Sequence, residues 1–344
     1  MRTQPEPDLV DLIADIIRAE GGRITFERYM ELALYHPRRG YYAARPPIGK
    51  TGDFLTNVSV GPLFGRILAS QFLKIRTELG NPPDFQIIEF GGHRGRFRDD
   101  VLREAPELDY QIIESGNPFP ERFTGCVFTN EFLDALPVHR VRVVGGCWKE
   151  LYVVTAVPGG IAPQECRRDS GYYKEEEGPL SSPRLQEALK GLPTHLMEGY
   201  TTEVNLRALD WMTDVAQRLT RGTVITIDYG YERDQYFAPH RQEGTLLCYH
   251  HHTENRNPFI HVGNQDITTH VEFTSLMEQG RRNGLETVLF CDQSQYLLEA
   301  GHEILAKITA RDGGQWSPER NQIHQLIHPT LMGSTFKVLV QQTR

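Results

Sequence analysis

Two groups of residues have the types and the spacing for chemistry on a cofactor or on a guanidinium group. The first is the turn EFGGHRG, from Glu89 to Gly95, which follows the apolar run FQIIEF (85–90). A glycine-rich turn between a strand and a helix lets the backbone approach a cofactor closely and directs free amides at it. An ordinary strand-to-helix turn explains the same pattern, so the turn does not identify a ligand by itself.

A carboxylate at the end of the next predicted strand adds to this signal. Glu114 ends the run YQIIE and lies 19 residues after Gly95. An acidic side chain at this place can hold the ribose hydroxyls of an adenosine cofactor. The alternative is a solvated glutamate at a strand end. Taken together, the turn and Glu114 predict a nucleotide-type cofactor site at the carboxyl edge of a parallel sheet.

The second group lies in NEFLDALP (130–137), directly after the predicted strand CVFTN (126–130). Glu131 and Asp134 are three residues apart and can lie on one face of a turn. Paired carboxylates can clamp a guanidinium with two parallel hydrogen bonds and take up its proton. A helix-capping acid beside a turn acid explains the same spacing, and that alternative stays open.

Two further segments give a weaker signal. Gly52-Asp53-Phe54 lies in a loop rich in glycine, proline and aromatic residues, of the kind that can fold over a site. The block 244–273 contains five histidines, three of them consecutive at 250–252. Adjacent residues on a strand point to opposite faces, and no cysteine or His-x-x-His spacing accompanies these histidines. We therefore predict no metal site.

The elements that must position these residues predict a doubly wound α/β protein. Short apolar runs are typical of buried parallel strands, and they occur at 85–90, 110–114, 126–130 and 223–229. Two late runs look like a closing pair of strands, at 286–290 and 335–342. A β-hairpin is predicted around Gly145-Gly146. Helices are predicted over 9–20, 25–35 with Thr25 as N-cap, 60–79 and near 203–219, and an irregular excursion over 156–200.

Charge and composition exclude some classes of partner. The 344 residues include 37 Lys and Arg against 45 Asp and Glu, a formal charge of −8. This balance argues against nucleic acid or an anionic membrane as the main partner. No apolar run approaches the roughly 20 residues of a membrane-spanning helix. The five scattered cysteines and a start without a recognisable presequence favour a reducing compartment, the cytoplasm of a bacterium or the mitochondrial matrix of a eukaryote.

Several longer segments resemble one family. They are ITFERYMELALYHPRRGYY (24–42), TGDFLTNVSVGPLFG (51–65), EFGGHRG (89–95), IIES (112–115), TNEFLDALPVHR (129–140), ITIDYG (225–230), GTLLCYHHH (244–252), QDITTHVEF (265–273) and LIHPTLMGSTFKVLV (326–340). Together they are similar to the MidA-type family, which has the class I methyltransferase fold and includes the mitochondrial complex I assembly arginine methyltransferase. The resemblance spans about 24–340. A nicotinamide-dependent oxidoreductase fits the glycine turn but not these segments.

The resemblance implies a Rossmann-like class I methyltransferase sheet with a reversed terminal strand, a helical N-terminal region and an inserted lobe. It implies S-adenosylmethionine as cofactor and a methylated arginine on a partner protein, a complex I subunit in the mitochondrial member. The residues implied to bind the cofactor are Glu89, Gly91, Gly92, Gly95, Glu114, Asn130, Gly52 and Phe54. Those implied to be catalytic are Glu131, Asp134 and Asp53. The oligomeric state is not implied.

The sequence patterns and the resemblance together predict the domain bounds. These are a helical N-terminal region with a lid loop (1–82), the first half of the core (83–155), an inserted lobe (156–202), and the second half of the core (203–344) with a substrate-side segment at 244–280.

Two departures from the family pattern leave a second hypothesis open. His93 replaces the middle glycine of the turn, where its side chain would meet the cofactor or force a backbone φ that histidine rarely adopts. Residues 115–125 are too few for the helix and additional strand that the family has beside the adenine. The alternative function is therefore a catalytically impaired methyltransferase-fold protein that acts as a partner-binding assembly factor.

Overall fold

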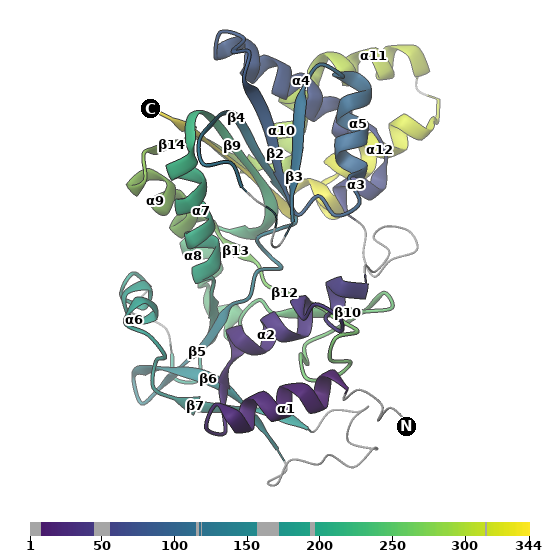
Figure 1. The fold of residues 1–344 in the computed structure, drawn as a ribbon. Helices are drawn as coiled ribbons and strands as arrows, with labels where there is room; N and C mark the ends of the chain where they lie inside the picture. Colours follow the sequence, from purple (N-terminus) through teal and green to yellow (C-terminus); the bar gives the residue numbers. More distant parts are fainter. Residues whose placement is uncertain are drawn as a thin grey trace, which may run out of the picture. The chain divides into compact units, whose positions relative to one another are not determined.

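The computed structural model describes residues 8–44, 56–114, 117, 119–156, 172–192, 197–313 and 315–344. The chain divides into two compact units, each made of three segments. Unit 1 comprises Met1–Phe54, Ala135–Arg207 and Asp234–Thr269. Unit 2 comprises Leu55–Asp134, Ala208–Arg233 and His270–Arg344. Figure 1 labels many elements of both units. No helix in the described ranges is long and apolar enough to cross a membrane.

Unit 2 contains a seven-stranded sheet with the order β14-β15-β9-β4-β2-β3, and β13 pairs with β9. The pairs β2–β3, β2–β4 and β4–β9 are parallel, whereas β15 is antiparallel to both β9 and β14. The closing pair with one reversed strand is thereby confirmed. The strands are β2 (Phe85–Phe90), β3 (Asp109–Ile113), β4 (Phe123–Asn130), β9 (Leu219–Tyr231), β13 (Val271–Glu272), β14 (Leu285–Asp292) and β15 (Phe336–Thr343).

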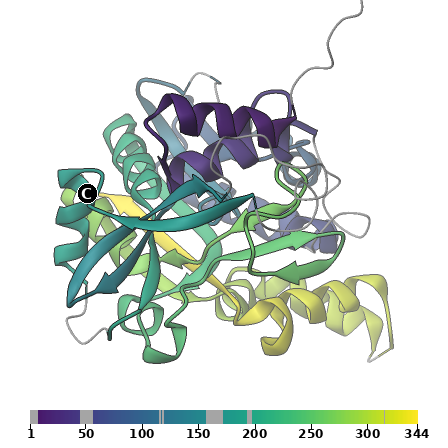
Figure 2. The ribbon, with the colours of Figure 1, turned by 90° about the horizontal axis from the view of Figure 1, so that it is seen from below.

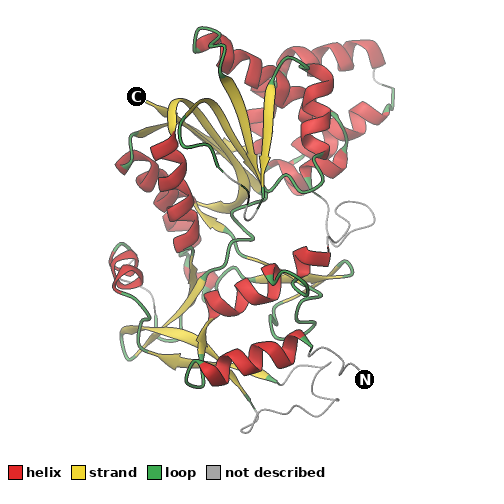
Figure 3. Ribbon diagram, in the orientation of Figure 1, coloured by secondary structure: helices red, strands yellow, loops and turns green. Residues whose placement is uncertain are grey.

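Helices cover both faces of this sheet (Figure 3). One face packs against a large core to which α4, α5, α10, α11 and α12 contribute, including the fully buried Phe64, Phe72 and Phe97. On the other face α9 contacts β14, β15 and β9, and Gln279 of α9 donates a hydrogen bond to Thr213 of α7 at 2.7 Å. The helices are α3 (Asn57–Val60), α4 (Leu63–Glu78), α5 (Arg96–Glu104), α7 (Leu206–Arg218), α9 (Phe273–Arg282), α10 (Gln293–Ala300), α11 (His302–Asp312), α12 (Pro318–Ile327) and a helical turn at Pro329–Gly333.

Unit 1 contains a five-stranded sheet with the order β1-β6-β5-β8, and β7 pairs with β6. A second, three-stranded sheet has the order β11-β10-β12. The strands are β1 (Ile24–Thr25), β5 (His139–Val144), β6 (Cys147–Thr155), β7 (Tyr173–Gly178), β8 (Thr201–Val204), β10 (Leu247–His250), β11 (Thr253–Asn255) and β12 (Asp266–Thr268). The helices are α1 (Leu9–Ala19), α2 (Phe26–Tyr35), α6 (Pro183–Lys190), α8 (Arg233–Tyr236) and two 3₁₀ turns, Tyr41–Ala44 and Pro239–Arg241.

The N-terminal helices pack on the sheet of unit 1, and Figure 2 shows both on one side of its strands. Thr25 caps α2 as predicted, because its hydroxyl accepts a hydrogen bond from the Arg28 amide at 3.1 Å. Tyr29 of α2 is fully buried, and its hydroxyl donates to the Pro258 carbonyl at 2.7 Å. Local capping and apolar spacing therefore predicted these two helices well.

The prediction of an irregular excursion over 156–200 is wrong for part of that range. Strand β7 and helix α6 lie within it, and the acidic run 175–177 is in β7. This strand forms by antiparallel pairing with β6, and Glu175 forms ion pairs with Arg140 and Arg142. A strand with charged, exposed side chains has no apolar alternation, so the sequence carried no strand signal there.

The predicted domain bounds differ from the two units. The hairpin of β5 and β6 is confirmed, with Val144 opposite Cys147, but both strands belong to the sheet of unit 1. A hairpin pattern is the same whichever sheet it joins, so spacing alone could not assign it.

Candidate functional site

Three predicted site residues lie at the carboxyl ends of neighbouring parallel strands in unit 2. Glu89 is near the end of β2, Glu114 follows β3, and Asn130 ends β4. Strand β2 lies between the other two, with Phe90 opposite both Ile113 and Thr129. The structure therefore brings these three residues to one edge of the sheet, where open α/β sheets bind ligands.

The glycine turn has a left-handed backbone at three of its residues. Gly91 has a φ of 73°, His93 of 49° and Gly95 of 72°. His93 thus adopts the φ that we expected to be forced on it, at a cost of about 1–3 kcal/mol. The backbone at position 93 therefore has a conformation suited to glycine, although the residue there carries an imidazole side chain.

Glu89 lies directly beneath this turn. The residue is 4% exposed, and its carboxyl group accepts a hydrogen bond from the Tyr110 hydroxyl at 3.0 Å. Burial raises the pKa of Glu89 to about 8, and the Tyr110 hydrogen bond opposes that shift. A Cβ on Gly92 would lie 2.8 Å from the Glu89 Oε2 atom. The turn therefore needs glycine at 92 in order to close over the buried carboxyl group.

Glu131 begins the loop after β4 and is held by its neighbours. Its φ is 53°, a left-handed value that is uncommon for glutamate. The Oε1 atom accepts hydrogen bonds from the Asn130 side-chain amide at 2.7 Å and from the Asn57 backbone N–H at 3.1 Å. These two donors fix the direction of the carboxylate, so Glu131 is an oriented group rather than a solvated one.

Asp228 is a buried residue of this edge that the sequence analysis did not include in the site. It lies near the end of β9 and is 0% exposed. Its Oδ2 atom accepts the backbone N–H groups of Phe132 at 3.2 Å, Leu133 at 2.9 Å and Asp134 at 3.4 Å. Burial raises its pKa to about 7, against the effect of the N–H donors. An acid at the end of a buried strand, in ITIDYG, was the signal that could have identified it.

Of the remaining predicted catalytic and lid residues, the structure describes only Asp134. Asp134 is 6% exposed and lies in the loop that Asp228 binds. The joint contact of Glu131 and Asp134 with a guanidinium stays a prediction. Gly52, Asp53 and Phe54 lie outside the described residues.

Strand β3 ends at Ile113 and β4 begins at Phe123, so the connection between them is short. Within the described ranges the sheet ends at β3, and residues 119–122 form neither helix nor strand. The Phe119 ring packs edge-on against Phe90, with centroids 5.1 Å apart. The Arg218 guanidinium lies 5.0 Å from the Phe119 ring centre and donates to the Phe119 carbonyl at 3.2 Å. An aromatic side chain from this connection therefore packs against the end of β2.

Comparison with known proteins identifies the family. The family described as "Putative S-adenosyl-L-methionine-dependent methyltransferase" matches residues 113–291, a little over half of the chain. The chain belongs to this family. Membership confirms the MidA-type resemblance and the class I methyltransferase fold, and S-adenosylmethionine is the cofactor of the family.

Individual relatives agree with this assignment. The chain is similar to the protein arginine methyltransferase NDUFAF7 homolog of Drosophila melanogaster (24% identity, 92% of this chain and 81% of the relative). The human protein arginine methyltransferase NDUFAF7 is also 24% identical, over 92% of this chain and 79% of the relative. A COG1565 superfamily member from Burkholderia thailandensis, bound to S-adenosyl-homocysteine, has a TM-score of 0.86 and 29% identity, covering 99% of this chain and 95% of that one. A native structure of a COG1565 protein from the same organism has a TM-score of 0.83.

The residues at the sheet edge fit the family's cofactor. The left-handed turn leads directly into α5, which has no side-chain N-cap, so its leading N–H groups suit an amino-acid carboxylate. Glu114 follows the neighbouring strand β3, where its carboxylate would be an acceptor for ribose hydroxyls. Apolar surface is supplied by Phe90, Phe132 and Trp211, whose rings lie 5.6–6.0 Å apart.

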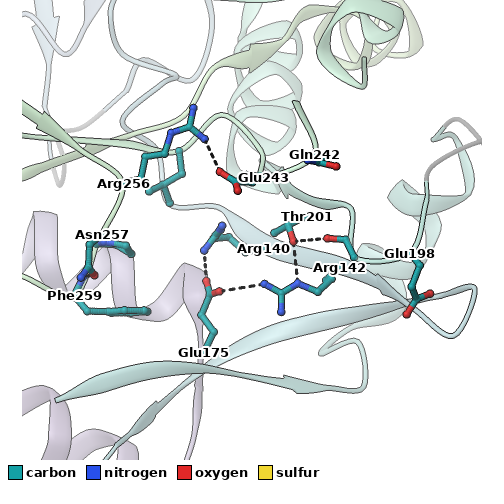
Figure 4. A pocket seen from close by; sticks show the side chains of 13 residues that line it. Arg140, Arg142, Glu175, Glu198, Thr201, Gln242, Glu243, Arg256, Asn257 and Phe259 are labelled. Carbon is teal, nitrogen blue, oxygen red and sulfur yellow. Dashed lines mark hydrogen bonds and ion pairs between the residues drawn. The ribbon is translucent and has the colours of Figure 1, made fainter. Parts of the chain in front are cut away.

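A cavity of about 680 Å³ lies in unit 1 (Figure 4). None of the predicted site residues lines it. Its arginines are paired with carboxylates, Arg140 with Glu175 and Arg256 with Glu243 at 3.3 Å. Several lining residues come from the segment 244–280, namely Leu246, Arg256, Asn257, Pro258 and Phe259. In the described part of the chain no three His, Cys, Asp or Glu side chains are grouped to hold a metal ion.

Proposed function

We propose that this protein is an S-adenosylmethionine-dependent protein-arginine N-methyltransferase of the MidA type. The observation that carries the proposal is the oriented carboxylate of Glu131, at the same sheet edge as the glycine turn. Its relatives are named protein arginine methyltransferases. A fixed carboxylate beside a cofactor turn suits a positively charged acceptor better than a neutral one.

The proposed chemistry asks the protein mainly for orientation. The cofactor supplies a methyl group on a positively charged sulfur. Glu131 would accept hydrogen bonds from the acceptor guanidinium, turn one nitrogen towards the cofactor and favour loss of its proton. Gly91, Gly92 and Gly95 would hold the cofactor, with Glu114 on its ribose and Glu89 beneath the turn. Asp228 would keep the loop of Glu131 in place through the three N–H groups that it binds.

The acceptor would be a protein, and the MidA-type resemblance suggests a subunit of respiratory complex I. We further propose that the segment 244–280 serves the substrate side. Its contribution to the cavity of unit 1 supports this role, because that cavity offers both arginine and glutamate side chains to a polar peptide. The curated relatives are mitochondrial proteins, and a mitochondrial or a bacterial cytoplasmic location suits the proposal.

Two observations favour the second candidate, an impaired methyltransferase that binds a partner as an assembly factor. His93 adds an imidazole to the turn, and the sheet lacks a strand outside β3 within the described ranges. Both changes affect the cofactor side, whereas Glu131 keeps its two donors. A protein that had lost methyl transfer would have no need of an oriented Glu131, so we place the impaired candidate second.

Methyl labelling tests the proposal. The purified protein is incubated with methyl-labelled S-adenosylmethionine and a protein extract of the source cell. Acid hydrolysis followed by mass spectrometry is expected to show labelled methylarginine. The matched control is Glu131→Gln, which keeps the size and an Oε1 acceptor but loses the charge. Absence of label with the folded native protein, together with a stable protein partner in a pull-down, would favour the second candidate.

A further inference from the structure

We propose that two buried amides, Asn57 and Gln293, are positioning residues for Glu131 and are required for methyl transfer. This inference rests on the proposed function, because it gives the two residues a role through Glu131 rather than on the substrate. Asn57 contacts Glu131 directly, and Gln293 contacts Asn57. Both side chains are 0% exposed and come from segments far apart in the sequence, the first turn of α3 and the start of α10.

The two amides form a reciprocal pair. The Asn57 Nδ2 atom donates to the Gln293 Oε1 atom at 2.8 Å, and the Gln293 Nε2 atom donates to the Asn57 Oδ1 atom at 2.8 Å. The second N–H of Gln293 donates to the Leu326 carbonyl at 3.1 Å. Because both N–H groups of Gln293 are used, its amide has one orientation, and the carbonyl of Leu326 in α12 fixes it.

The pair continues to Glu131 through Asn130. The second N–H of Asn57 donates to the Asn130 Oδ1 atom at 2.9 Å, which leaves the Asn130 Nδ2 atom directed at the Glu131 carboxylate at 2.7 Å. The acceptor at Asn130 Oδ1 thus determines which end of the Asn130 amide faces Glu131. If the Asn130 amide turned over, its oxygen would meet the carboxylate and repel it.

The backbone of Asn57 makes the second contact. Asn57 is the first residue of α3, where an N–H has no acceptor within the helix, and this N–H donates to the Glu131 Oε1 atom at 3.1 Å. A capping box of Thr56 and Ser59 holds that turn in place, with hydrogen bonds of 3.0 and 3.2 Å. One residue therefore delivers both donors to Glu131, one directly and one through Asn130.

Buried networks of this kind can serve stability alone, and the test must separate the two roles. Removing one amide leaves the other buried and unpaired, whereas replacing both by apolar side chains of similar shape is much less costly. A structural role predicts that stability and turnover recover together in the double variant. A positioning role predicts that stability recovers in part and turnover does not, because Asn130 has still lost its donor.

The experiment compares Asn57→Leu, Gln293→Met and the double variant with the native protein. Gln341→Met is the matched control, since Gln341 is also 0% exposed and in unit 2 but lies on β15 outside the network. Melting temperature, calorimetric affinity for S-adenosylhomocysteine and the rate of labelled methyl transfer from S-adenosylmethionine to the cell extract are measured. Each single variant is expected to melt roughly 5 °C lower and to transfer methyl groups at least about tenfold more slowly.

In the double variant the melting temperature should rise above that of either single variant. The rate of methyl transfer should stay at least about tenfold below that of the native protein. The affinity for S-adenosylhomocysteine should differ from the native affinity by less than about threefold. Gln341→Met should lower the melting temperature without lowering the rate of methyl transfer. Recovery of the rate in the double variant, or an equal loss of rate in Gln341→Met, would overturn the inference while the native protein remains active. If the native protein itself transfers no label, the proposed function fails first and the inference fails with it.

Discussion

The two sides of the sheet edge in unit 2 are built by different means. On the side of β2 and β3 the geometry is set by the backbone, with left-handed residues at 91, 93 and 95. On the side of β4 and β9 it is set by hydrogen bonds between buried polar groups, two to Glu131 and three to one oxygen of Asp228. A site shaped by backbone can accept a new side chain if φ is kept, as at His93. A site shaped by specific donors can accept very few substitutions.

The largest expected effect is that of Asp228→Ala. It leaves the N–H groups of Phe132, Leu133 and Asp134 without their acceptor in a buried place. We expect the free energy of unfolding to decrease by about 3–5 kcal/mol and methyl transfer to be lost, as measured by urea unfolding and labelling. Asp109→Asn, at an exposed position of β3, is the control and should cost less than about 0.5 kcal/mol. Equal stability of the two variants would contradict this account of the loop.

The next effect separates the two sides by function. Glu131→Gln should lower the rate of methyl transfer at least about 100-fold, with the S-adenosylhomocysteine affinity changed less than about threefold. Glu114→Gln should do the reverse, weakening that affinity about tenfold through loss of a charged acceptor. Calorimetry measures the affinity of both variants and the labelling assay measures their rates, so together they show which quantity each substitution changes. If both substitutions affected the same quantity, the division of the edge into two functional sides would be wrong.

A smaller effect concerns the carboxyl group beneath the turn. Folding raises the pKa of Glu89 from 4.5 to about 8, so the folded protein favours the protonated form. This contribution to stability is complete below pH 4.5 and decreases as the pH rises towards 8. We expect Glu89→Gln to remove a decrease in the free energy of unfolding of up to about 1.4 kcal/mol per pH unit between pH 5 and pH 8, as measured by urea unfolding at each pH. Asp228, whose pKa is about 7, should keep part of the slope.

The smallest predicted effect is at His93. His93→Gly keeps the left-handed φ without strain and removes the imidazole, so S-adenosylhomocysteine should bind about fivefold more tightly. Asn81→Gly is the matched control, because Asn81 also has a left-handed φ, 54°, but lies outside the turn. Calorimetry should show no change in affinity for that control. If the affinity were also unchanged in His93→Gly, the imidazole of His93 would not weaken cofactor binding.

Much of the fold was predictable because local signals agreed with the final structure. The run FQIIEF became β2 with the expected bounds, and Thr25 caps α2 as its hydroxyl suggested. Strand β7 was not predictable, since pairing with β6 and ion pairs create it rather than apolar spacing. The helices α10, α11 and α12 were also not predicted, although their apolar residues complete the core of unit 2.

The candidate site was predictable only where the signal for a residue lay within one short segment of the sequence. The glycine turn, Glu114 and Glu131 each follow a recognisable strand, so their common edge followed from the rule for parallel sheets. Asn57 and Gln293 contact each other across 236 positions of sequence, and a single buried amide gives no periodic signal. Asp228 had a local signal but needed the loop of Phe132 to Asp134 to give it a role. Long-range polar partners are the part that the sequence could not supply.

The central claim is that the turn with left-handed His93 still forms a cofactor site. A calorimetric titration of the native protein with S-adenosylhomocysteine tests it most directly. We expect saturable heat with one ligand for each chain, and tighter binding in His93→Gly. Folded protein that releases no heat up to high micromolar ligand, in both the native and the His93→Gly form, would contradict it.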